Sequence, residues 1–189
     1  MTKLIVQSIK QTILWTVLVG VLYPLAITVV AQSAFARQAN GSLIERRGTI
    51  VGSELLAQQF TSARYFWSRP SAGNYATVPS GASNLGPTSK KLQDSVDSLA
   101  AALRATHHLP PDAPVPADLV FTSGSGLDPH ISPEAARFQI ARVAAARGLS
   151  ETKVKALVER LIEPPQWGFL GEPRVNVLRL NLALDELQT

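Results

Sequence analysis

The chain has 189 residues, no cysteine and a formal net charge of +4 at pH 7. From Arg37 onward there are 16 Lys and Arg against 14 Asp and Glu, so the positive charge is a small excess on a mixed surface. The sequence lacks a run of cations with interleaved aromatic residues, which argues against nucleic acid as a partner. The absence of cysteine excludes a disulfide framework and thiolate metal sites.

An uncharged segment of 26 residues lies between Lys10 and Arg37. As a helix, its core from Ile13 to Ala31 would span about 28 Å, close to the hydrocarbon thickness of a bilayer. A cleaved signal peptide is the alternative, because Ala34-Phe35-Ala36 fits a small-residue cleavage site, but the apolar stretch is longer than in typical signal peptides. The segment therefore predicts a retained membrane anchor that also contacts membrane lipid.

The orientation of this anchor does not follow from its flanking charges, because Lys and Arg occur on both sides of it. A short leader before a long domain is typical of a signal-anchor with an exported domain. We therefore expect residues 1–10 to be cytoplasmic, 11–34 to form the transmembrane helix and 35–189 to form an extracytoplasmic domain. The expected location is the cell inner membrane, with a single pass.

Small or weakly polar residues recur at every fourth position of this segment. Such residues let a second helix approach closely and offer hydroxyl groups across the contact. A chance pattern is the alternative, because glycine and proline are common in transmembrane helices and a four-residue repeat drifts around a helix. The predicted packing face consists of Thr12, Thr16, Gly20, Pro24 and Thr28.

The first half of the remaining chain predicts one strand, two helices and a long loop. The strand covers Arg46–Ser53, and a helix follows through Glu54–Phe60. The stretch Tyr65–Pro87 has no period, and a loop this long is usually functional or held by its own side chains. Pro87 is expected in the first turn of a helix, whose apolar face would be Leu92, Val96, Leu99 and Leu103.

The second half begins with a proline-rich extended link and predicts a brief strand over Leu119–Thr122. A helix then starts at Ser132-Pro133 and stops at Gly148, and another starts at Ser150. Its apolar face would be Val154, Leu157, Val158, Leu161 and Ile162. Alternating Val and Leu side chains predict a final strand in Pro173–Leu187. The expected fold class is α+β, with one transmembrane helix and a single domain of few short strands.

The stretch SGSGLDPHIS, Ser123–Ser132, contains the residue types of a serine hydrolase in Ser125, Asp128 and His130. A nucleophile elbow needs glycine two residues before and after the serine, and this chain does not have them. Glycine, Asp-Pro and Ser-Pro instead favour a turn that starts a helix. A membrane-anchored exported hydrolase that uses Ser125 and His130 is kept as the alternative.

Two further patterns are weak. The segment Gly81–Thr88 has the glycine spacing of a phosphate loop, but Pro87 stands where lysine should follow the second glycine. His107 and His108 are adjacent, whereas a zinc site needs three or four converging ligands. We therefore predict no catalytic residue and no metal site, and we assign no cofactor-binding residue.

The aromatic stretch Tyr65–Tyr75 is the predicted partner surface. Tyr, Trp and Arg dominate binding hot spots, because they bury large areas with few rotatable bonds. The alternative is that Phe66 and Trp67 fill the core of the domain. The candidate contact residues are Tyr65, Phe66, Trp67, Arg69 and Tyr75.

Several segments in order carry a resemblance to a known family. They are YPL (23–25), ANGSLI (39–44), GSELLAQQF (52–60), YFWSRPSA (65–72), SGASNLGP (80–87), SGSGLDPHIS (123–132), AARFQIARVAAARGL (135–149) and PRVNVLRLNLALDEL (173–187). Together they strongly resemble the C subunit of the Kdp potassium-transporting P-type ATPase complex of bacteria and archaea. Small departures occur at Leu55–Gln58, where the family typically has LIGQ, and at Ser89-Lys90, where it often has Asn-Pro.

This resemblance implies an accessory, non-catalytic subunit beside a channel-like potassium-binding subunit and a separate ATP-hydrolysing P-type subunit. It implies roles in assembly and as a catalytic chaperone that raises the ATP affinity of the hydrolysing subunit. ATP as a ligand of this chain is also implied by the resemblance alone. A domain outside the membrane does not meet cytoplasmic ATP, so we expect the effect to be a coupling transmitted through shared helices. A free nucleotide-binding module is a third class of function.

Overall fold

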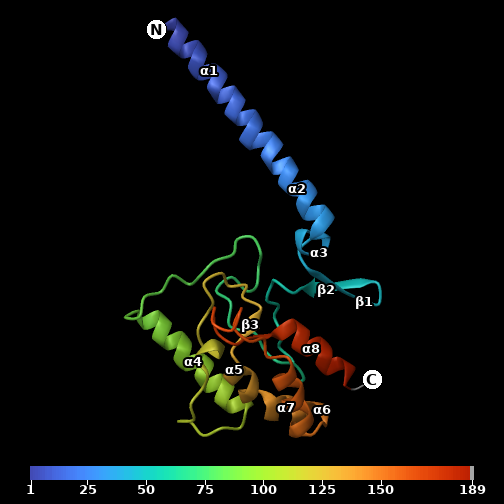
Figure 1. Cartoon of the computed structure of the whole chain (residues 1–189). Helices are drawn as coiled ribbons and strands as arrows, with labels where there is room; N and C mark the ends of the chain where they lie inside the picture. The colour runs from blue at the N-terminus through green and yellow to red at the C-terminus, as the bar shows by residue number, and fades with distance from the viewer. Residues whose placement is uncertain (188–189) are drawn as a thin grey trace. The chain divides into compact units, whose positions relative to one another are not determined.

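Figure 1 shows the chain as a computed structural model, which describes residues 1–187. The backbone divides into two compact units, Met1–Val51 and Gly52–Thr189.

The first unit is dominated by one continuous helix, Thr2–Ala34, of 33 residues. It consists of α1 (Thr2–Val17), a π-helical turn η1 (Leu18–Leu22) and α2 (Tyr23–Ala34). The helix is long and apolar enough to cross a membrane. It begins earlier than the predicted span, because the residues before Gln11 continue the same helix (Figure 1).

A short helix α3 (Ala36–Ala39) follows, and then a two-stranded hairpin whose last two residues fall beyond Val51. The strands are β1 (Leu43–Arg46) and β2 (Thr49–Ser53). Arg47 and Gly48 have φ values of 53° and 77°, as a two-residue hairpin turn requires. The predicted strand Arg46–Ser53 is therefore confirmed from Thr49 onward, and its partner β1 was not predicted.

The second unit is helical, with one very short sheet. Its helices are α4 (Lys90–Thr106), η2 (Ala117–Leu119), α5 (Pro133–Phe138), α6 (Ile140–Arg147), α7 (Glu151–Arg160) and α8 (Val177–Glu186). Its strands, β3 (His130–Ile131) and β4 (Val175–Asn176), pair antiparallel with His130 opposite Asn176. The expected α+β class, with few short strands after an N-terminal apolar helix, is confirmed.

The core of this unit lies between α5, α6, α7 and α8, with α7 in contact with the other three. Fully buried side chains include Val143, Val154, Val158 and Leu180. The predicted apolar face of α7 is confirmed, because Val154, Leu157 and Val158 are buried and Leu161 and Ile162 pack against them. The predicted face of α4 is partly buried and contributes Leu103 to the core.

Local signals set the helix ends. The side chains of Ser89, Ser132, Ser150 and Asn176 each accept a hydrogen bond from a backbone N–H in the first turn of α4, α5, α7 and α8. Gly148 ends α6 in the left-handed conformation, with φ 67°. The predicted helix after Ser132 is interrupted at Gln139, which separates α5 from α6.

Two predicted elements are wrong. Glu54–Phe60 is irregular and not helical, because distant groups engage its backbone. The Ala57 N–H donates to the carbonyl of Leu127, and the Glu54 carbonyl accepts from the side chain of Asn176. Leu119–Thr122 is not a strand, because Leu119 ends the 3-10 turn η2 and Val120 caps it.

The predicted strand in Pro173–Leu187 is also wrong after its first residues. Only Val175–Asn176 is strand, and α8 follows directly. Val177, Leu180, Asn181 and Leu184 are buried at helical spacing, so one helix face packs into the core. The side chain of Asn176 begins this helix by accepting from the N–H of Arg179 at 3.1 Å.

Candidate functional site

The aromatic loop Tyr65–Pro87 is held from inside the domain. The structure describes every residue of this loop and assigns it no helix or strand. Phe66 is fully buried in the core, so it does not contribute to a contact surface. For this residue the alternative interpretation, a core side chain, is the one that the structure supports.

Two buried amide side chains pair with the backbone of this loop. Asn181 accepts from the Phe66 N–H at 2.8 Å and donates to the Phe66 carbonyl at 2.9 Å. Gln139 makes the same pair of bonds with Trp67, at 2.8 and 3.2 Å. The loop backbone therefore satisfies its polar groups with side chains from α8 and from the break between α5 and α6.

Two arginines from α6 hold the start of the loop. Arg142 donates to the carbonyls of Ala63 and Tyr65, at 2.7 and 3.1 Å, and its guanidinium lies 4.0 Å from the Trp67 ring centre. Burial lowers the pKa of Arg142 to about 10. Arg147 donates to the Arg64 carbonyl, pairs with Asp185 at 2.7 Å and lies over the Tyr65 ring. Each arginine thus makes both hydrogen bonds and a cation–π contact, and together these fix the start of the loop.

The remaining candidate contact residues are partly buried, and most of their polar atoms bond within the domain, whereas Arg69 Nε is buried without a hydrogen-bond partner among the described residues. The Trp67 Nε1–H donates to the Ser62 carbonyl, and the Tyr75 hydroxyl donates to the Arg69 carbonyl at 2.8 Å. Burial raises the pKa of Tyr75. The surface that remains for a partner consists of the exposed parts of Tyr65, Trp67, Arg69 and Tyr75.

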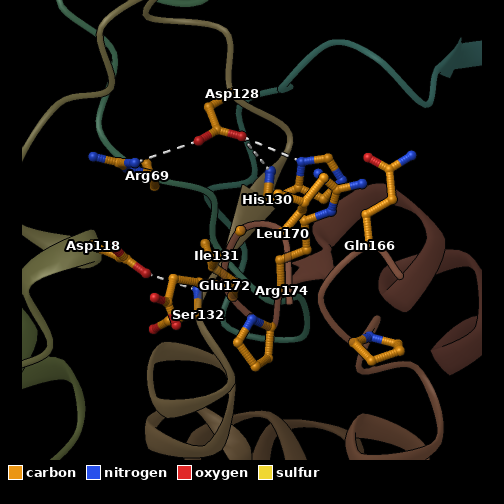
Figure 2. Close-up of a pocket in the computed structure, with 13 residues that line it drawn as sticks. Arg69, Asp118, Asp128, His130, Ile131, Ser132, Gln166, Leu170, Glu172 and Arg174 are labelled. Carbon is orange, nitrogen blue, oxygen red and sulfur yellow. Dashed lines mark hydrogen bonds and ion pairs between the residues drawn. The ribbon is translucent and has the colours of Figure 1, made fainter. Parts of the chain in front are cut away.

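A cleft of about 760 Å³ lies beside this loop and is lined by both charged and apolar residues (Figure 2). Asp128 accepts from Arg69 Nη1 at 3.3 Å and from the His130 N–H at 3.0 Å. Burial raises the pKa of Asp128, but hydrogen bonds from His130 and the charges of His130 and Arg69 together hold it below its ordinary value. Asp118, across the cleft, accepts from the Ser132 N–H at 2.7 Å. Both carboxylates, Asp118 and Asp128, therefore accept hydrogen bonds from their own domain and hold the chain on either side of β3 in place.

The structure does not bring Ser125 and His130 together as a hydrolase requires. Ser125 is exposed, and its Oγ accepts from the N–H of Leu127 at 3.0 Å. Among the described residues, no hydrogen bond joins Ser125 to His130, whose Nδ1 lies 3.4 Å from Asp128. In residues 1–187 no group of three or more His, Cys, Asp or Glu side chains is placed to hold a metal ion.

The turn interpretation of the same stretch accounts for its glycines. Gly126 has a φ of 71°, and a Cβ there would lie 2.9 Å from the Gly81 carbonyl oxygen. Only glycine permits this close approach between the turn and the aromatic loop. The stretch therefore joins the loop to the start of β3 and α5.

The π-helical turn η1 reduces the angle by which the small-residue repeat drifts around the apolar helix. An α-helix advances about 100° per residue, so four repeats from Thr12 to Thr28 would drift about 160° around it. In η1 the Tyr23 N–H bonds to the Leu18 carbonyl, five residues back, which adds one residue to the turn. This extra residue removes about 100° of the drift, so the repeat keeps within about 60° of one face.

Pro24 gives a physical reason for η1, because proline has no N–H to donate to the Gly20 carbonyl. The hydroxyls of Thr12 and Thr28 donate to carbonyls of their own helix, those of Ser8 and Pro24, at 2.9 and 2.8 Å. These two hydroxyls are thus bonded within the helix. The face formed by the repeat therefore presents small side chains and is nearly apolar.

Comparison with known proteins gives a consistent result. The family model "K+-transporting ATPase, c chain" matches residues 5–186. The chain belongs to the KdpC family. The potassium-transporting ATPase KdpC subunit of Rhodospirillum rubrum is 59% identical over 90% of this chain and 89% of its own length. That of Methylococcus capsulatus is 54% identical over 96% of each chain, and that of Koribacter versatilis is 50% identical over 100% and 97%.

Membership of the KdpC family makes this chain a subunit of a potassium-transporting ATPase. Sequence reasoning found the aromatic loop and the turn but missed the side chains that hold them. Gln139 and Asn181 each interrupt an apolar stretch of the sequence, and this was the available signal. The partners of these amides lie 72 and 115 residues away in the sequence.

Proposed function

We propose that this chain is a non-catalytic accessory subunit that stabilises a high-affinity, ATP-driven potassium uptake complex. Its partners are a channel-like potassium-binding subunit and a P-type subunit that hydrolyses ATP. The observation that carries this proposal is the match to the c chain of a potassium-transporting ATPase over residues 5–186, together with one apolar helix long enough to span a membrane. The packing of Asp128, His130 and Ser125 into a structural turn also favours a supporting role over a catalytic one.

The proposed orientation has the N-terminus in the cytoplasm, the helix across the inner membrane and the α+β domain outside. Because the chain has no cysteine, single-cysteine variants can report the location of each part. In cells with a permeabilised outer envelope, a membrane-impermeant maleimide should label Ser98→Cys on α4 and not Thr2→Cys. Labelling of Thr2→Cys alone would show the opposite orientation, and labelling of a chain shortened after Ala36 would show a cleaved signal.

The helix face formed by Thr12, Thr16, Gly20, Pro24 and Thr28 is the proposed site of contact with partner helices. A Cβ at Gly20 would meet only Thr16 Cγ2, at 3.8 Å, so the chain itself has room for a side chain there. Gly20→Leu should therefore leave the subunit intact and disturb only close packing with a neighbour, at a cost of about 1–3 kcal/mol.

The Gly20→Leu complex should yield roughly tenfold less of this subunit on co-purification in detergent. The matched control is Val19→Leu, which adds bulk at a neighbouring position that is already large and exposed. An unchanged yield of Gly20→Leu would contradict the packing face.

The same preparations test the proposed coupling to ATP. A subunit that raises ATP affinity from the other side of the membrane acts through a coupling free energy, which typically corresponds to a factor of about 5–150. The ATP concentration for half-maximal hydrolysis should therefore rise as the subunit is lost from the Gly20→Leu complex. Saturable ATP binding to the isolated full-length chain would instead indicate direct contact with the nucleotide.

A further inference from the structure

The segment from Glu163 to Arg174 forms a small hairpin that displays apolar side chains. Glu163 and Arg174 exchange backbone hydrogen bonds of 2.8 and 3.0 Å, and their side chains pair at 3.0 Å. Nearer the end of the hairpin, Gln166 and Leu170 exchange two bonds of 2.9 Å. We call Trp167, Phe169 and Leu170 the aromatic tip.

The aromatic tip is the most exposed aromatic cluster of the second unit within the described residues. Trp167 is 79% exposed and Phe169 is 74% exposed, whereas Phe66 and Trp67 of the aromatic loop are buried or partly buried. Large apolar side chains gathered at one exposed place usually mark a contact with another molecule. Trp and Phe are also among the residues enriched in the buried centres of interfaces.

The hairpin holds this tip in a fixed shape. Trp167 has a φ of 54° and Gly168 a φ of 84°, so a bulky residue occupies a left-handed position that glycine or asparagine normally takes. The hydrogen bonds of Gln166 and the prolines at 164, 165 and 173 keep the turn closed around it. A preordered tip loses little conformational entropy when it binds.

The charges near the tip favour a protein over a lipid surface. Residues 164–171 are uncharged, and the hairpin carries Glu163 and Glu172 against Arg174. Segments that bind the bilayer surface usually flank their apolar residues with cations, because the headgroup region attracts them. Glu163 also pairs with Arg179 at 3.5 Å, so the charges near the tip balance and leave no excess of cations for a headgroup. An uncharged aromatic tip instead suits an apolar pocket on another polypeptide.

The size of the tip shows that it is one anchor of a larger contact. Two aromatic side chains bury about 300–500 Å², and a stable interface needs about 800 Å² on each partner. The membrane helix gives the chain a second attachment, so the tip need not bind alone. The hairpin also supplies Leu170, Glu172 and Arg174 to one wall of the cleft, which places polar groups beside the tip (Figure 2).

We infer that the aromatic tip inserts into an apolar pocket of another subunit of the same potassium-transporting ATPase. This inference rests on the proposed function. The pocket must accept a Trp and a Phe from a hairpin and must lie on the side of the membrane that holds this domain. The tip is therefore the domain's anchor on the complex, separate from the membrane helix.

The first test replaces both aromatic side chains and keeps the turn. In Trp167→Asn/Phe169→Ser, asparagine suits the left-handed position, so the hairpin should remain folded. On dilution of the assembled complex in detergent, this variant should dissociate at least tenfold faster than the wild-type subunit. The control Leu55→Asn/Val78→Ser, which removes exposed apolar side chains elsewhere in the unit, should dissociate at the wild-type rate. Equal rates for the two double variants would overturn the inference.

The second test identifies the occupant. A photo-crosslinking benzoyl-phenylalanine at position 167 in the assembled complex should join this chain to another subunit of the ATPase, identified by mass spectrometry. Crosslinks only to lipid or to a second copy of this chain would overturn the inference and leave the proposed function standing. Failure of the wild-type chain to co-purify with other ATPase subunits would instead overturn the proposed function itself.

Discussion

Replacing Asn181 with leucine is expected to lower the free energy of unfolding by roughly 2–5 kcal/mol. Asn181 is 2% exposed and bonds both the N–H and the carbonyl of Phe66. Leucine has a similar size but leaves both backbone groups buried without a partner, and each such group costs about 1–3 kcal/mol. Urea unfolding of the full-length chain in mild detergent, followed by circular dichroism, measures the change.

The matched control for Asn181→Leu is Gln93→Leu on the exposed side of α4. This substitution also exchanges an amide for a leucine, but the backbone there is bonded within α4, where the Gln93 N–H donates to the Ser89 carbonyl. Its effect should therefore be within about 0.5 kcal/mol. Equal effects of the two variants would show that the paired amide and backbone of the loop contribute nothing special to stability.

Acidification from pH 6.5 to about 4 is expected to destabilise the second unit through His107. Burial lowers the pKa of His107 to about 4, with further contributions from the charges of Arg142 and His108. Its Nε2 accepts from Arg142 Nε at 3.2 Å, and its ring lies 4.4 Å from that of Phe138. The folded state therefore holds a neutral imidazole between an arginine and an aromatic ring.

The direction of this stability change follows from the number of protons that His107 binds in the folded and unfolded states. Above pH 6.5 both states carry a neutral His107, and its contribution to stability is fully present. Between pH 6.5 and about 4 only the unfolded chain binds the proton, so stability falls as the pH falls. The two pKa values correspond to about 3 kcal/mol, which solvent screening at a partly buried side chain reduces to about 1–2 kcal/mol.

His107→Gln should remove this part of the pH dependence, because glutamine can accept from Arg142 and does not titrate. His108→Gln, at the exposed neighbouring position, should keep most of it, because the charge of His108 is the smallest of the three causes of the lowered pKa. The pKa values of Asp128 and Glu159 are lowered in the folded state, so these carboxylates also lose stabilisation as the pH falls. They do so equally in wild type and variants, and the difference between wild type and His107→Gln isolates His107. Urea midpoints at pH 7 and pH 4.5 give the comparison, and an equal pH dependence in wild type and His107→Gln would contradict the assignment.

Elements with local signals could be predicted from the sequence. Ser132-Pro133, Gly148 and Ser150 mark helix ends through hydrogen bonds within one turn, and the structure confirms these boundaries. Glu54–Phe60 has a helical pattern too, but its backbone bonds to residues that only the folded chain brings near. In Val177–Glu186 the apolar residues fit both an alternating and a helical pattern, and packing against α7 selected the helix.

The candidate site was less predictable for the same reason. The aromatic stretch was recognised by composition, which does not show that Phe66 points into the core. The hairpin Glu163–Arg174 contains prolines and glycines that suggest only a loop, and its exposed Trp167 is evident only from the conformation of the turn. The family could be recognised because many short segments occur in order along nearly the whole chain.

The pairing of loop backbone with Asn181 and Gln139 has a consequence for aggregation. The peptide groups of Phe66 and Trp67 bond to side-chain amides, whereas extended backbone elsewhere usually bonds to a neighbouring strand. A strand in that place would itself present an outer row of unpaired N–H and carbonyl groups, which can recruit further chains. A side-chain amide has no further backbone groups to pair, so this part of the loop is ordered without an edge on which other chains could stack.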